Sequence, residues 1–554
     1  NLKMNIELRD PNVIMKLSRL GSFHQSKLSF LRSFLDEFKE WKYNRDLFEL
    51  NDKGFGTAIY SFKKNERVYS LICFANQIND KERSDRVIAT KWDAAFTLHD
   101  GTPSQEDIDR LRNEVPKQEV GRLSYKELTL SRANKSVRIF DHVVESLSNG
   151  KQPNLELLKE VGYLYRTTAV YGSGKFGLAD RFRVKNREEI NGPFRLEMML
   201  VYLVRQFTFD QVNHVAKFKN PKKAVKLDPQ ICKNLGIGNS TGLGMAPFIV
   251  NHPTLLNNWI LCRETALKKI REIKNVKLQE SNLFKMCVRN SIRNITSWNT
   301  ESEYQLKKIQ SLLNDVKNFL DFVEKKFDFK INFPFNELYH WLEKNAGEEC
   351  IEYIVSIMME PFNEIVKPLI KQMSSEEEKY FNIPTERTVE DLRFIIEKKY
   401  PTILKIDFEN KKNYKKFWFI SKNKEEPRLG DRFENSGSNL EQPLAIARDI
   451  KALYNKLLLA ENSTIDKFLI NNADLRHVIR RVFIVEKFPY SEIQDNTISE
   501  NVVPIDMLRL KLSFFGALKF DPRSDKWLRI CMFQGAPLPN ELKNFDDLWV
   551  YKSH

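Results

Sequence analysis

The chain has 554 residues, of which 42% are hydrophobic and 29% are charged, and its formal net charge is +15. A chain of this length is too long to fold around one hydrophobic core, so we expect roughly two to four domains. The composition excludes a disordered or fibrous protein. Six cysteines without CxxC spacing exclude a disulfide framework and indicate a reducing compartment, so we expect a cytoplasmic protein.

The partners are constrained by charge and hydropathy. No segment reaches the roughly 20 apolar residues of a membrane span, and the first residues lack a signal-peptide core, so we expect no membrane partner. The positive charge favours anionic partners. Because basic residues are spread along the chain among acidic ones, we favour a small anionic substrate over nucleic acid.

The N-terminal region, 1–103, is predicted to combine helix with an antiparallel hairpin. Apolar spacing predicts helix over most of 11–45. FGTAIYSF (55–62) and RVYSLICF (67–74) predict the hairpin, and a third strand is expected over 86–98.

The next region, 104–275, is predicted to be helical with two glycine-rich loops. Ser104 begins a capped helix, Asp228-Pro229 opens a short one, and Pro253 suits the first turn of a later one. Longer helices are expected over 125–148, 155–169, 195–218 and 254–273.

The remaining chain is predicted to be a helical middle section, 276–400, and a mixed region, 401–554. The strongest amphipathic helix is expected over 303–326. β character returns at 416–421 and in a second hairpin formed by KLSFFGALKF (511–520) and KWLRICMF (526–533). The predicted fold class is α+β, mainly α, with a helical centre and antiparallel hairpins near both ends of the chain.

Two glycine-rich stretches stand out, RTTAVYGSGKFGLADR (166–181) and GIGNSTGLGMAPFIVNHP (236–253). The second holds four of the chain's 20 glycines, a composition that helix and strand interiors disfavour. We therefore predict that both are loops and that they face each other across a ligand site.

The familiar motifs do not account for these stretches. GSGKFG lacks the hydroxyl residue that a P-loop needs after its lysine, because Phe176 follows Lys175. The second stretch lacks GxGxxG after a strand, and a predicted short helix precedes its GxSxG at 238–242 where a nucleophile elbow needs a strand. Glycines that expose backbone amides beside Lys175 instead indicate an anion site.

The candidate site residues combine cations, short polar groups and histidines. Arginine suits bidentate binding of carboxylate or phosphate, and a helix that begins near Pro253 attracts negative charge. The candidate catalytic residues are His252, His214 and Lys175. The candidate substrate-binding residues are Arg166, Tyr171, Arg181, Asn239, Ser240, Thr241, Asn251 and Arg263. No His/Cys cluster predicts a metal site, and the cofactor is left open.

These residues predict a cytoplasmic enzyme that acts on a small anionic metabolite, a carboxylate or a phosphate ester, by metal-independent acid–base chemistry. Lyase, isomerase and hydrolase are not separable. One alternative is a nucleotide- or cofactor-dependent enzyme with an atypical phosphate loop, and another is a basic nucleic-acid-binding or scaffold protein.

Three phrases, YRTTAVYGSGKFGLADR (165–181), GNSTGLGMAPFIVNHP (238–253) and KFDPRSDKWLRICMFQ (519–534), resemble a family of long, uncharacterised bacterial proteins. The resemblance covers most of the chain. It implies no activity, cofactor or catalytic residue.

Overall fold

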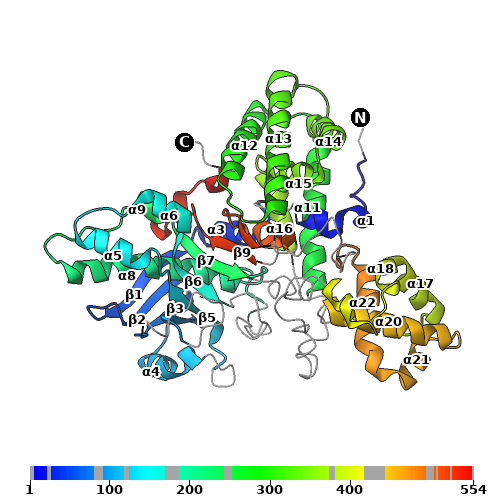
Figure 1. Cartoon of the computed structure of the whole chain (residues 1–554), viewed down its shortest axis with the longest axis horizontal. Coiled ribbons are helices and arrows are strands. Elements are labelled where there is room, and N and C mark those ends of the chain that lie inside the picture. Colours follow the sequence, from blue (N-terminus) through cyan, green and yellow to red (C-terminus); the bar gives the residue numbers. More distant parts are fainter. Residues whose placement is uncertain are drawn as a thin grey trace.

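The structure is a computed structural model. It describes residues 5–21, 26–79, 91–117, 124–168, 184, 186–241, 252–373, 381–416, 443–493, 505–506, 509–524 and 527–551. A twisted sheet lies at the left of Figure 1, one helical group lies at the top and a second lies at the right. The α+β, mainly α fold class is confirmed.

One nine-stranded sheet joins the two ends of the chain. Its strands are β1 (Lys42–Leu50), β2 (Gly56–Lys64), β3 (Arg67–Ala75), β4 (Ala94–Asp100), β5 (Glu127–Lys135), β6 (Tyr163–Thr168), β7 (Gly236–Thr241), β8 (Asp521–Ser524) and β9 (Trp527–Met532). Their order is β1-β2-β3-β4-β5-β6-β7-β9-β8. Among these strands β6 and β7 are parallel, and every other neighbouring pair is antiparallel. The sheet therefore takes strands from three of the four expected regions, 1–103, 104–275 and 401–554.

Helix α8 (Arg195–Lys219) covers one face of the sheet. Its residues 195–205 are buried all round, as expected for a helix enclosed by other elements. Tyr60 and Tyr165 on the sheet donate hydrogen bonds to Asp210 and Gln211 on α8, each over 2.9 Å. Helices α3 (Phe30–Phe38) and α5 (Phe140–Ser148) pack against α8 and extend the same core.

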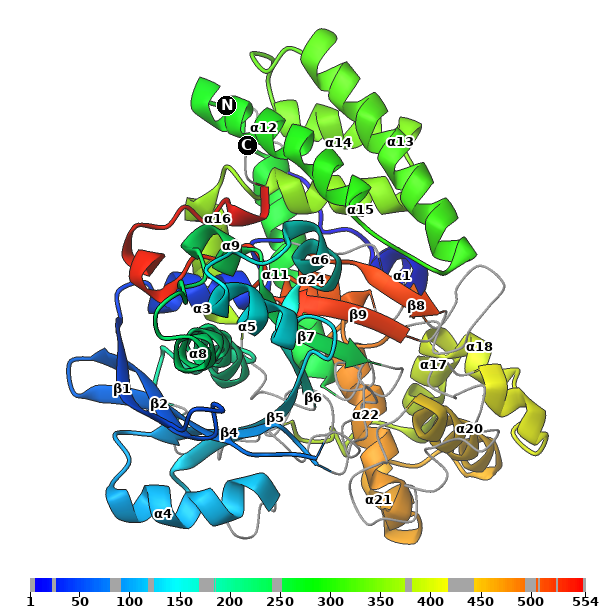
Figure 2. The same cartoon turned by 60° about the vertical axis from the view of Figure 1, so that its left-hand side comes forward.

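Helix α4 (Gln105–Glu114) covers part of the opposite face, so that the sheet lies between α4 and α8 in Figure 2. Ser104 caps α4 in a capping box with Asp107, as the sequence predicts. Ile108 and Leu111 pack against Leu130 of β5 in a separate apolar cluster. The candidate site lies on this same face of the sheet, outside the part that α4 covers.

The two helical groups follow the first seven strands. The upper group consists of α11 (Pro253–Arg271), α12 (Leu278–Thr296), α13 (Glu303–Lys325), α14 (Pro334–Asn345), α15 (Glu348–Met358) and α16 (Asn363–Gln372). The right-hand group consists of α17 (Val389–Lys399), α18 (Pro401–Leu404), α20 (Pro443–Leu459), α21 (Ile465–Asn471) and α22 (Arg476–Lys487). Short helices elsewhere are α1 (Pro11–Ile14), α2 (Leu17–Leu20), α6 (Leu155–Val161), α9 (Pro229–Lys233) and α24 (Leu510–Phe515).

A buried ion cluster ties the N-terminal segment to the upper helices. Glu352 of α15 accepts hydrogen bonds from Arg9 (2.8 Å), Arg19 (2.6 Å) and Arg263 (2.8 Å). Glu264 of α11 also accepts from Arg9. Burial alone would raise the pKa of Glu352, but the three guanidinium groups lower it to about 2.

Two predicted helices, 155–169 and 125–148, are wrong, because each contains a strand as well as a helix. The stretch predicted as helix over 155–169 is helix only to Val161, since Gly162 adopts φ +82° and ends α6. YLYRTT then forms β6. The stretch 125–148 likewise divides into β5 and α5.

The ends of the chain also differ from prediction. The described residues of 11–45 include three short helices and the start of β1. The third strand runs over 94–100, and the part of its prediction over 86–90 lies outside the described residues. In the predicted strand 511–520, Leu510–Phe515 is helix α24, which ends where Gly516 adopts φ +84°. The C-terminal hairpin is β8–β9. The predicted strand at 416–421 lies outside the described residues except for Lys416, which ends a 3₁₀ turn.

Candidate functional site

Both glycine-rich stretches begin as strands that lie side by side. Arg166 in β6 pairs with Gly238 in β7, and Thr167 pairs with Asn239. Because the strands are parallel, their last described residues, Thr168 and Thr241, lie at the same edge of the sheet. Ligands of open sheets bind outside the carboxyl ends of parallel strands, which makes this edge the first place to search for a site.

Close packing explains Gly236 and Gly238, the two glycines of the second stretch that lie within the described residues. The prediction of a loop is wrong for residues 236–241, which form β7. A Cβ at Gly238 would lie 2.5 Å from Cδ1 of Tyr163, and a Cβ at Gly236 would lie 2.1 Å from the carbonyl oxygen of Met532. Neither glycine has a positive φ, so both are needed for space between strands.

A row of residues crosses four strands at this edge. Arg132 of β5 pairs with Thr168, and Arg529 of β9 pairs with Ser240. Since Thr167 pairs with Asn239, the positions that follow continue the row from Thr168 to Ser240. Two arginines therefore flank the last residues of the parallel strands.

Arg166 lies next to this row of residues and on the same face of the sheet. It pairs with Asn134 of β5 and lies two residues before Thr168, and strand residues two apart share a face. Leu130, two residues before Arg132, packs beneath α4, which identifies this as the α4 face of the sheet. We call Arg132, Arg166 and Arg529 the arginine row.

The three side chains of the arginine row are buried or partly buried. Burial destabilises a charged group that lacks a partner. Arg166 is 8% exposed. The Cζ atom of Arg132 lies 4.3 Å from the ring centroid of Trp92, and burial lowers the pKa of Arg132. Among the described residues, no group accepts a hydrogen bond from Nε or Nη1 of Arg529, although both atoms are buried. A bound anion would accept hydrogen bonds from Nε and Nη1 of Arg529 and offset the cost of burying that charge.

Asn239 belongs to the other face. Its Nδ2 donates to the carbonyl oxygen of Thr167 over 3.3 Å, and its side chain is 1% exposed. This hydrogen bond links β6 to β7 on the face opposite the arginine row. For Ser240 and Thr241, the structure gives the backbone positions that pair with Arg529 and Leu528.

His252 lies at the start of α11, next to Pro253, which occupies the first turn as predicted. The carbonyl oxygen of His252 accepts from the N–H of Leu256 over 3.0 Å, so the imidazole is attached at the positive end of the helix dipole. The other predicted site residues of the two stretches lie outside the described residues: Lys175, Tyr171, Arg181 and Asn251.

Two predicted site residues lie elsewhere. His214 is on α8, where its Nε2 lies 2.8 Å from the carbonyl oxygen of Asn51 and its ring contacts Phe48 of edge strand β1. Arg263 is fully buried in the ion cluster with Glu352. The structure brings neither residue to the arginine row.

Sequence reasoning did not select Arg132 or Arg529 for this site. Arg132 stands in ELTLSRANK, whose alternation signals a strand, but the stretch was predicted as helix. Arg529 stands in KWLRICMF, which the sequence predicts as a strand of the second hairpin. Their proximity depends on pairing between β9 and β7, which are nearly 300 residues apart in the chain.

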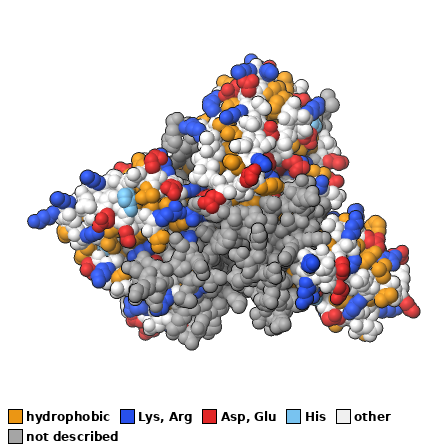
Figure 3. Space-filling view, in the orientation of Figure 1, with side chains coloured by type: hydrophobic (Ala, Val, Ile, Leu, Met, Phe, Trp, Pro, Cys, Tyr) orange, Lys and Arg blue, Asp and Glu red, His pale blue; other side chains and the backbone are white. Residues whose placement is uncertain are grey.

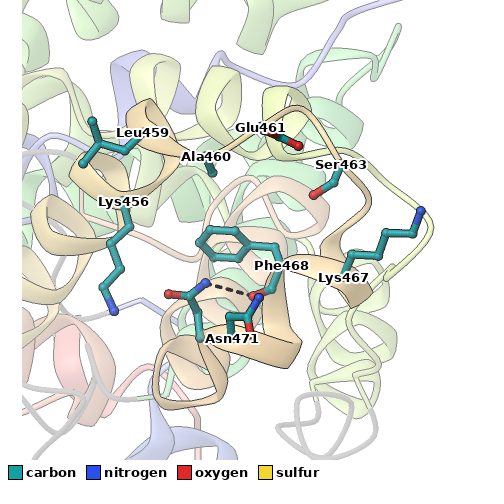
Figure 4. Close-up of a pocket in the computed structure, with 9 residues that line it drawn as sticks. Lys456, Leu459, Ala460, Glu461, Ser463, Lys467, Phe468 and Asn471 are labelled. Atoms are coloured by element: carbon teal, nitrogen blue, oxygen red, sulfur yellow. Dashed lines mark hydrogen bonds between the residues drawn. The ribbon is translucent and has the colours of Figure 1, made fainter.

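A separate hollow of about 390 Å³ lies between α20 and α21. Figure 4 shows Lys456, Glu461, Ser463 and Lys467 around its rim and Phe468 at its base. It is open to solvent and presents no histidine or cysteine. Its lining gives no reason to expect chemistry there.

Neither a metal cluster nor a membrane-spanning helix is found among the described residues. They include no group of three His, Cys, Asp or Glu side chains that could hold a metal ion. None of the described helices is both long enough and apolar enough to cross a bilayer. No protein-family model, curated protein or solved structure matches the chain.

Proposed function

We propose that the chain is an enzyme that acts on a small anionic substrate, a carboxylate or a phosphate ester, held where β6 and β7 end. The observation that carries this proposal is the arginine row on one face of the sheet, with Nε and Nη1 of Arg529 buried and without an acceptor among the described residues.

We assign the chemical roles as follows. Guanidinium groups bind carboxylate and phosphate through paired N–H donors, so the arginine row would hold the charged end of the substrate. His252 is the proposed proton donor or acceptor, because an imidazole accepts a proton in its neutral form and donates one in its protonated form. The glycine-rich segments after Thr168 and Thr241 would supply backbone amides to developing negative charge.

The experiment is a thermal-shift screen of the purified chain against phosphate, phosphate monoesters and mono- and dicarboxylates. A ligand that binds only the folded state raises the melting temperature. At least one anion should raise it, and Arg529→Gln should abolish the shift. Arg67→Gln is the matched control, because Arg67 lies on β3 of the same sheet and is half exposed, with Glu189 3.9 Å away.

Two outcomes would contradict the proposal. The first is a screen in which no anion raises the melting temperature. The second is an anion whose effect is the same in wild type, Arg529→Gln and Arg67→Gln, since that anion would bind away from the arginine row.

A further inference from the structure

The C-terminal end of α8 carries a dense group of lysines. Residues 217–226, KFKNPKKAVK, contain five lysines and no acidic residue, and all five are exposed. Lys151 is also exposed, and its neighbour Gln152 donates a hydrogen bond from Nε2 to the carbonyl oxygen of Lys226. We call residues 217–226 together with Lys151 the lysine tip.

The lysine tip keeps a strong net charge after its acidic neighbours are counted. Glu145 of α5 forms an ion pair with Lys219, and Asp228 caps α9 just beyond the tip. Six lysines against these two acids leave a net charge of +4. Lys222, Lys223 and Lys226 have no ion pair among the described residues, so their ammonium groups remain available to a partner.

The backbone of the tip is fixed. The N–H of Val225 donates to the carbonyl oxygen of Leu147 over 3.0 Å, and the N–H of Leu227 donates to Oδ1 of Asn213 over 2.8 Å. The N–H of Ala224 donates to the carbonyl oxygen of Asn220, which closes the turn. A preformed surface of this kind loses little conformational entropy when it binds.

Apolar side chains stand among the lysines. Phe218 is 55% exposed and Val225 is 38% exposed. The ring of Phe218 is tilted against the ring of His214, with ring centroids 4.7 Å apart. Figure 1 places this end of α8 at the left-hand extremity of the molecule, where basic side chains project in Figure 3. The lysine tip is therefore convex and combines positive charge with exposed apolar groups.

We propose that the lysine tip binds the surface of a bilayer that contains anionic phospholipids. A projecting tip can meet a flat surface with all its lysines within a Debye length of the headgroups. Phe218 and Val225 can enter the boundary between headgroups and acyl chains, as apolar residues of interfacial segments do. Nucleic acid fits less well, because an aliphatic Val225 offers no surface on which a base stacks.

This peripheral contact differs from our expectation of no membrane partner, which considered only spanning segments. It is independent of the proposed substrate site, because the lysine tip lies at the end of α8 and the arginine row lies on the opposite face of the sheet from that helix. Loss of either site leaves the other testable.

The experiment is cosedimentation of the full chain with vesicles of phosphatidylcholine alone or with 30% phosphatidylserine at 0.1 M salt. A lysine near an anionic surface contributes a factor of about five to the partition coefficient. The triple variant Lys222→Gln, Lys223→Gln, Lys226→Gln should therefore bind anionic vesicles about a hundredfold more weakly. Phe218→Ser should weaken binding several-fold and leave the salt dependence unchanged.

The matched control removes three exposed lysines elsewhere, in Lys317→Gln, Lys330→Gln, Lys344→Gln. It has the same net charge as the triple tip variant and should bind within about twofold of wild type. Wild-type binding that is equal on neutral and anionic vesicles would overturn the proposal, as would equal loss in the two triple variants. Binding to a single-stranded RNA that requires the tip, without vesicle binding, would overturn it and assign the tip to nucleic acid.

Discussion

Replacing Glu352 by Gln should destabilise the fold in a pH-dependent way. The carboxylate accepts hydrogen bonds from Arg9, Arg19 and Arg263 and is fully buried. Gln keeps the shape but removes the charge, so three buried guanidinium groups lose their shared counterion. Glu264 remains as a second acid that contacts Arg9 and Arg263.

The magnitude follows from the pKa of Glu352. The three arginines, acting against burial, lower that pKa from 4.5 to about 2 in the folded chain. At about 1.4 kcal/mol per pKa unit, the charged form contributes about 3 kcal/mol to the free energy of unfolding at pH 7. Because the folded pKa is depressed, this contribution is complete above pH 4.5 and is lost as the pH falls from 4.5 towards 2. The difference between wild type and Glu352→Gln should therefore be about 1 kcal/mol smaller at pH 3.5 than at pH 7.

The assay is urea unfolding followed by tryptophan fluorescence, since Trp259 is buried on α11 beside the ion cluster. The control is Glu324→Gln, because Glu324 pairs with the largely exposed Arg289 and should cost less than about 1 kcal/mol. A loss below about 1 kcal/mol for Glu352→Gln at pH 7, or a difference that does not change with pH, would refute the reasoning.

Three further predictions concern packing, thiols and capping. Gly238→Ala should destabilise the fold by about 2 kcal/mol in urea unfolding, because its Cβ would overlap the ring of Tyr163, and an unchanged midpoint would contradict the packing account. All six cysteines are buried and burial raises the pKa of each thiol, so a chromogenic disulfide reagent at pH 8 should label none within minutes before unfolding and six after it. Ser104→Ala should cost about 1 kcal/mol by removing the cap of α4, and Ser104→Asp should restore most of the loss in the same unfolding assay.

The sequence predicted those elements whose structure depends mainly on residues close together in the chain. The N-cap at Ser104, the Asp228-Pro229 helix start and the amphipathic pattern of α13 are present as predicted. In each case the residues of one helical turn, or of one helix face, are enough to predict the feature. The fold class and the presence of strands near both ends followed from the same kind of signal.

The candidate site could be predicted only in part, because it depends on strand pairing over long distances. Arg166 was selected from its own sequence neighbours. Its approach to Arg132 required recognising β5 as a strand, and its approach to Arg529 required the pairing of β7 with β9. Gly236 and Gly238, which suggested an irregular loop, are instead required by close contacts with Met532 and Tyr163, and no local pattern reveals these contacts.

The most direct test of the proposed site is a crystal structure of the chain with tungstate, a heavy analogue of phosphate that is located by its anomalous scattering. We predict tungstate on the α4 face of the sheet, within hydrogen-bond distance of Nε and Nη1 of Arg529. Tungstate bound only elsewhere, with Arg529 and Arg166 paired to carboxylates of the chain itself, would contradict an anion site at the ends of β6 and β7.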